Sequence, residues 1–78
     1  MKVSGEVLKT PIIGQTEVTY DIIDDEKIFH IVSTGKQAKK DIVFVREGQS
    51  IEVTGTAEGN TIKAKKGYIN IYKEIREI

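Results

Sequence analysis

Lysine and aromatic side chains gather near the end of this 78-residue sequence. Lys63, Lys65, Lys66 and Tyr68 lie within one short segment, and the window 61–73 holds four lysines and no acid. Lysines neutralise phosphates and aromatic rings stack on bases, so this combination is typical of proteins that bind single-stranded nucleic acid. The same lysines also suit a solvated strand edge that resists aggregation. In that interpretation Tyr68 only covers one end of the fold.

Catalytic residue types are almost absent. His30 is the only histidine, and there is no cysteine. We find no serine with a second catalytic partner and no glycine loop that could hold a phosphate, so we expect no enzymatic activity and no cofactor. His30 can stack on a base or touch a phosphate, or it can be an ordinary strand histidine. The acids at 21 and 24–26 lack the spacing and glycine of a calcium loop, so we expect a solvated turn there and no metal.

Composition favours an all-β domain. Ile occurs 13 times, Val 7 times and Thr 7 times, so 27 of 78 residues are β-branched. These side chains are stiff at χ1 and suit a pleated, half-buried surface. The length allows one domain, residues 1–78, whose stability must come from packing because no disulfide can form. No apolar run is long enough to span a membrane and no signal peptide is recognisable, so a cytoplasmic location without membrane contact is expected.

Charge is distributed unevenly along the chain. The net charge is zero, but residues 1–35 carry three lysines against six acids, and residues 36–78 carry nine basic residues against six acids. An asymmetry of this kind can mark a polarised binding surface.

Segments that alternate apolar and polar residues predict five half-buried strands. They are residues 2–10, 17–23, 27–34, 51–57 and 61–72, with residues 73–78 as a frayed or helical tail. Gly5 lies at the middle of the first strand, where it predicts a bulge or a sharp bend. Gly67 predicts a bulge in the fifth strand. Pro11 ends the first pairing, which leaves residues 11–15 as a loop.

The alternation also predicts which side chains face the core. An even number of loop residues between the second and third strands places Tyr20 and Ile22 with Phe29 and Ile31 on the inner face. The outer face then holds Thr19, Asp21, Ile28, His30 and Val32, whereas an odd loop would exchange Phe29 and His30. In the later strands the residues expected to point inward are Ile51, Val53, Gly55, Ala57, Ile62, Ala64, Ile69 and Ile71.

Residues 35–50 connect the third and fourth strands. Gly35 ends the third strand, and residues 36–41 can form one helical turn with Ala38 directed inward. The apolar run at 42–45 is too short for an independent helix, so we interpret it as a plug over one end of a barrel, with Phe44 in the core. Five strands with a helical or irregular plug between strands three and four describe a five-stranded OB-fold barrel. An SH3-like barrel is the main alternative, although its connections are usually shorter.

Two segments resemble a known family. Residues 35–38 (GKQA) followed by 44–55 (FVREGQSIEVTG) resemble the corresponding part of bacterial single-stranded-DNA-binding proteins. The chain also resembles the OB domains of archaeal replication protein A, where an Asp- and Gly-rich turn precedes the third strand and Gly-x-x-Ala follows it. Residues 5–7 (GEV) look like the start of the first strand in those domains. The resemblance implies an OB-fold and contact with single-stranded nucleic acid.

Carried over by position, the resemblance places Ile28 where the bacterial proteins have a DNA-stacking Trp. His30 falls on a DNA-contacting Arg and Thr34 on an aromatic residue. These exchanges remove much of the stacking platform, which is worth roughly 1–3 kcal/mol per base.

Two functions follow from these patterns. The first is an OB-fold module that binds single-stranded DNA or RNA through the face of strands two and three and the loop between strands four and five. Its site residues would be Thr19, Ile28, His30, Lys63, Lys65, Lys66 and Tyr68. The second is a protein-interaction or assembly module, for example a homo-oligomer, that keeps the barrel without nucleic-acid binding.

Overall fold

The computed structural model describes residues 1–71 and 74–77, with side chains up to Gly67. Within this part of the chain the elements are β1 (Lys2–Val7), β2 (Ile12–Ile13), β3 (Glu17–Asp24), β4 (Lys27–Thr34), α1 (Gly35–Phe44), β5 (Ser50–Glu58), β6 (Thr61–Ile71) and β7 (Glu74–Glu77).

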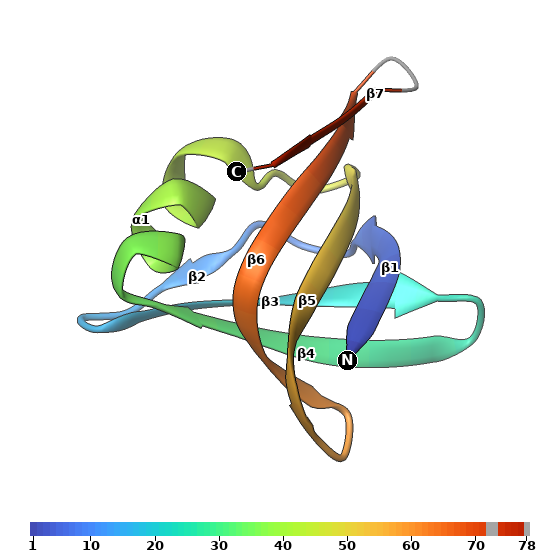
Figure 1. Ribbon diagram of the computed structural model, residues 1–78, viewed down its shortest axis with the longest axis horizontal. Coiled ribbons are helices and arrows are strands. Elements are labelled where there is room, and N and C mark those ends of the chain that lie inside the picture. Colours follow the sequence, from blue (N-terminus) through green and yellow to red (C-terminus); the bar gives the residue numbers. More distant parts are fainter. Residues whose placement is uncertain (72–73, 78) are drawn as a thin grey trace.

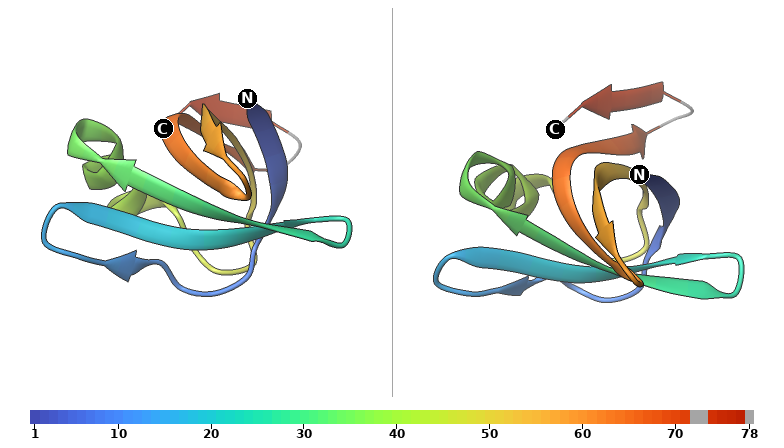
Figure 2. Two further views of the ribbon diagram at one scale, coloured as in Figure 1. Left: turned by 90° about the horizontal axis from the view of Figure 1, so that it is seen from below. Right: turned by 60° about the horizontal axis from the view of Figure 1, so that its bottom comes forward.

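Five of these strands close into a barrel (Figure 1). They pair in the order β1–β5–β6–β4–β3, and β3 pairs back with β1. The pairing of β4 with β6 is parallel, and the other pairings around the ring are antiparallel. Helix α1 joins β4 to β5 and lies at one end of the barrel, as Figure 2 also shows. The predicted OB-fold barrel, with its connector between the third and fourth barrel strands, is confirmed.

The hairpin of β3 and β4 has the predicted parity. Asp24 pairs with Lys27, so the loop contains two residues, and Asp25 adopts a positive φ of 55° in it. Tyr20 therefore lies opposite Ile31 on the inner face, and both side chains are buried. The core that results is made of Val3, Val7, Val18, Tyr20, Ile22, Phe29, Ile31, Ala38, Val45, Ile51, Val53 and Ile62.

Two glycines allow the barrel to close. A Cβ atom added to Gly5 would lie 2.1 Å from the carbonyl oxygen of Ile23, and one added to Gly55 would lie 2.0 Å from that of Lys63. No side chain fits at these distances. Gly5 sits where β1 leaves β5 and turns to pair with β3, which confirms the bend predicted there.

The bulge lies elsewhere than predicted. Thr54 pairs with Lys66 and Gly55 pairs with Ala64, so Lys65 is the extra residue of β6. Gly67 is a regular, buried member of the ladder opposite Val53. The bulge adjoins Gly55, where the absence of a side chain lets β5 approach β6 closely.

Helix α1 corrects the interpretation of residues 42–45. They do not plug the barrel as a group, because the helix continues to Phe44 and leaves Ile42, Val43 and Phe44 exposed. The buried positions are Ala38, Asp41 and Val45, whereas Phe44 is 49% exposed. Arg46 closes the helix, since its guanidinium Nη1 donates hydrogen bonds to the carbonyl oxygens of Ile42 and Val45.

Three further expectations differ from the structure. The loop expected at 11–15 contains β2, which pairs with β3. The tail expected to be frayed or helical contains β7, which pairs antiparallel with β6. It can do so because β4 covers β6 only from Thr61 to Lys63, so the edge of β6 beyond that point is available for pairing. Ala57, expected inside, is exposed near the end of β5, beside the β5–β6 turn (Figure 1).

Candidate functional site

The outer face of β3, β4 and the start of β6 brings most of the predicted site residues together. We define this outer face as Thr19, Asp21, Ile28, His30, Val32, Thr61 and Lys63. The strand register arranges six of these residues in two rows. One row is Thr19, Val32 and Lys63; the other is Asp21, His30 and Thr61. Ile28 lies beside Ile23 at the hairpin end of the face and is 43% exposed.

His30 is fixed on the outer face by two contacts. Its ring Nδ1 lies 2.6 Å from Oδ1 of Asp21, directly opposite on β3. Because an ionised carboxylate can only accept, Nδ1 is the donor in this contact. The His30 backbone N–H donates to the carbonyl oxygen of Asn60 at 2.8 Å, which ties the β5–β6 loop to this position. The histidine side chain is still 60% exposed and can meet a ligand.

The predicted lysines differ in their place on β6. Lys63 belongs to the outer face, next to Val32. Lys65 and Lys66 are exposed but follow the last residue of β6 that pairs with β4, and Lys65 is the bulged residue. The side chain of Tyr68, the remaining predicted site residue, lies outside the described residues.

A pocket next to the outer face contains three residues of the β1–β3 connection that sequence reasoning missed, namely Lys9, Thr10 and Ile12. It measures about 150 Å³ and is lined by Lys9, Thr10, Ile12, Thr19, Tyr20 and Asp21. Lys9 and Ile12 come from the connection between β1 and β3, the first of the two loops that border the ligand face in OB-folds. The backbone N–H of Leu8 donates to the carbonyl oxygen of Asp21 at 3.0 Å and holds this connection in place. In an OB-fold the loop after the first barrel strand borders the ligand face, so the position of Lys9 in this loop could have identified it as a site residue from the sequence.

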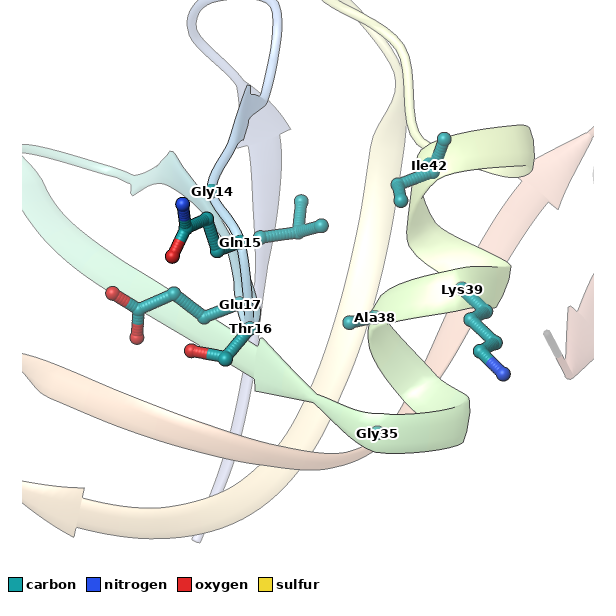
Figure 3. A pocket seen from close by; sticks show the side chains of 9 residues that line it. Gly14, Gln15, Thr16, Glu17, Gly35, Ala38, Lys39 and Ile42 are labelled. Carbon is teal, nitrogen blue, oxygen red and sulfur yellow. The ribbon is translucent and has the colours of Figure 1, made fainter.

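A second cleft, of about 390 Å³, lies between the β2–β3 turn and α1 (Figure 3). Ala38 and Ile42 point from the helix toward the turn, where Gly14 and Gln15 form the opposite wall. Lys39 lies at its border. This cleft does not include any residue of the outer face.

A buried polar cluster joins α1 to the barrel. Asp41 is fully buried and accepts hydrogen bonds from the Ser33 hydroxyl, at Oδ2, and from the Gln37 amide, at Oδ1 and 2.8 Å. Burial raises the pKa of Asp41, and the two hydrogen bonds partly oppose that shift. Burial, with the nearby Asp41 carboxylate, raises the pKa of Tyr20 well above its usual range, so the phenol stays neutral. Its hydroxyl is buried and has no hydrogen-bond partner among the described residues.

Within residues 1–71 and 74–77, we find no group of three side chains suited to hold a metal ion. The same part of the chain contains no helix that is long and apolar enough to cross a membrane.

Comparison with known proteins gives a clear result for structures only. No protein-family model matches the sequence, and no curated protein sequence matches it either. Among solved structures, the chain is similar to part of TiaS in a complex with an isoleucine tRNA, AMPCPP and agmatine. The TM-score is 0.76 and the identity 23%, over 90% of this chain and 18% of that one.

Two related structures give the same picture. Apo TiaS, a tRNA agmatidine synthetase, matches with a TM-score of 0.72 and 25% identity, over 87% of this chain and 17% of that one. A tRNA fluorescent labeling enzyme matches with a TM-score of 0.74 and 25% identity, over 90% and 17%. The chain therefore spans less than a fifth of the length of these proteins and is similar in fold to one barrel-shaped part of them.

Proposed function

We propose that this OB barrel is a nucleic-acid-binding module that contacts RNA through its outer face and acts by binding rather than by catalysis. The observation that carries the proposal is the similarity, over 90% of the chain, to part of a protein whose structure contains bound tRNA. The face that OB-folds use for oligonucleotides is the one on which His30, Thr19 and Lys63 meet in this chain.

The chemistry of the outer face supports contact with unpaired nucleotides. Lys63 and Lys9 supply cations for phosphates at two borders of the face. Thr19 and Thr61 offer hydroxyl groups that donate and accept hydrogen bonds, which suits a ribose 2′-hydroxyl. Ile28 and the His30 ring provide an apolar and an aromatic surface for bases.

The charge reversal Lys63→Glu tests the site. It is expected to weaken RNA binding about tenfold at low salt, because a charge-assisted phosphate contact is replaced by repulsion. The slope of log affinity against log salt should fall in magnitude by about 0.7, the contribution of one phosphate contact on a single strand. Fluorescence anisotropy with a labelled oligo-U, oligo-dT and a tRNA measures both quantities.

Lys40→Glu is the matched control, because it makes the same charge change at an exposed position of α1. Its affinity should stay within twofold of the wild type. Equal losses for the two variants would mean that net charge, and not the outer face, governs binding. No binding of any of the three probes at tens of micromolar protein would refute the proposed function.

One observation favours protein contact as a second candidate function. Ile42, Val43 and Phe44 are 41%, 57% and 49% exposed at the end of α1, next to one another in the sequence. Large apolar side chains in one exposed group are typical of surfaces that another protein covers. Light scattering over a range of concentrations tests whether that partner is a second copy: a constant monomer mass argues against self-association.

A further inference from the structure

The carboxylate of Asp21 is unusual for its place. It lies on the outer face, is 42% exposed, lines the same pocket as Lys9 and is separated from Lys63 by β4. A phosphate is repelled by a carboxylate, so this position is unsuited to the nucleic-acid backbone. A base edge with hydrogen-bond donors is instead attracted to it.

The surroundings of Asp21 orient its carboxylate and leave it able to accept hydrogen bonds from a ligand. His30 donates to Oδ1 at 2.6 Å and fixes the orientation of the group, while Oδ2 has no hydrogen bond from a described residue. Each carboxylate oxygen can accept more than one hydrogen bond, so both oxygens keep capacity for a ligand. His30 is therefore a positioning residue for Asp21 as well as a surface for bases.

We propose that Asp21 reads guanine in the bound RNA, an inference that rests on the proposed function. Guanine is the base whose Watson–Crick edge presents two adjacent donors, N1–H and the N2 amino group, and these match the two oxygens of one carboxylate. Adenine presents an acceptor, N1, beside its single amino group and meets the carboxylate with repulsion. Proteins that recognise unpaired RNA read bases through these edges.

The spacing of the outer face fits this assignment. The row that contains Asp21 and the row that contains Lys63 are two strand residues apart, or about 6.7 Å. Since β4 lies between β3 and β6, the two residues are about 12 Å apart along the diagonal of the face, a span that one nucleotide and the long lysine side chain can cover together. A nucleotide can therefore place its phosphate near Lys63 while its base reaches Asp21. In this arrangement Lys63 binds the phosphate of the RNA backbone, and Asp21 selects the base.

The test uses oligo-U 12-mers that carry one central guanosine, inosine or adenosine, with affinities measured by anisotropy. The wild-type protein is expected to bind the guanosine probe about tenfold more tightly than the adenosine probe. Inosine, which lacks the N2 amino group, should fall between them. Asp21→Asn should bind all three within twofold of one another, and its affinity for plain oligo-U should not decrease.

Asp25→Asn is the matched control, because it makes the same exchange in the hairpin turn, where φ is 55° and asparagine is well tolerated. This variant should keep the full guanosine preference. Equal wild-type affinity for the three probes, or a preference that survives in Asp21→Asn, overturns the inference while leaving RNA binding intact. Failure of every probe to bind overturns the proposed function and this inference with it.

Discussion

Replacing Gly5 with alanine is expected to remove more than half of the free energy of unfolding of the protein. The new Cβ would lie 2.1 Å from the Ile23 carbonyl oxygen and 2.7 Å from its carbonyl carbon. Both are backbone atoms of β3, so relief requires that β1 and β3 separate. Overpacking against backbone costs at least about 3 kcal/mol, and a domain of this size has a free energy of unfolding on the order of 5 kcal/mol. Urea denaturation followed by circular dichroism measures the loss.

Gly59→Ala provides the comparison. Gly59 has a φ of 61° in the β5–β6 turn, but nothing lies within 4 Å of the added Cβ. Alanine there carries only the cost of the left-handed backbone, about 1–2 kcal/mol. If Gly5→Ala were as stable as Gly59→Ala, the close approach of β1 to β3 would not be what holds the ring closed.

Removing the Asp41 carboxylate is expected to have opposite effects with two different replacements. Asp41→Ala leaves the buried Ser33 hydroxyl and the Gln37 amide without their acceptor. Each unsatisfied group costs about 1–3 kcal/mol, so the free energy of unfolding should fall by roughly 2–3 kcal/mol. Asp41→Asn keeps a hydrogen bond to each neighbour, because the Ser33 hydroxyl can also accept. It removes a buried charge and should match or exceed the wild-type stability at pH 7.

The dependence of these differences on pH has a definite sign. Because the folded state raises the pKa of Asp41, protonation of this group favours folding. Its contribution is fully present below the unfolded value of 3.8 and is lost as pH rises through the folded pKa. The wild type should therefore lose stability relative to Asp41→Asn between pH 4 and pH 7. Urea midpoints of both proteins across this range measure the effect, and a constant difference would contradict it.

Local patterns predict the barrel because its strands obey simple rules. Alternation in the segments around Tyr20 and Phe29, with an even turn between them, determines which side chains face the core. Glycine at position 5 indicates the bend, because only a residue without a side chain allows that approach. These features depend on neighbours in sequence, and so the sequence reveals them.

The errors have two causes, helical geometry at the end of α1 and long-range structure elsewhere. The apolar run predicts Phe44 in the core, but helical geometry directs Asp41 inward instead. The strand Glu74–Glu77 forms because one edge of β6 is uncovered, which no local pattern records. The candidate site shows the same division: strand alternation is enough to bring Thr19 and His30 to one face, whereas Lys9 reaches the outer face only through the path of its loop.

The way in which the ring closes has a consequence for how fast the protein folds. The β3–β4 and β5–β6 hairpins have two-residue turns, so each can form within about 1–10 μs. Closure, however, pairs His30 with Thr61 and Lys2 with Thr54, and these partners are far apart along the chain. The chain loses entropy when such loops close, before the paired strands gain stabilising contacts. This order of events typically slows folding to milliseconds or seconds. We therefore expect two early hairpins and one late, rate-limiting step in which β1 and the parallel β4–β6 pair join them.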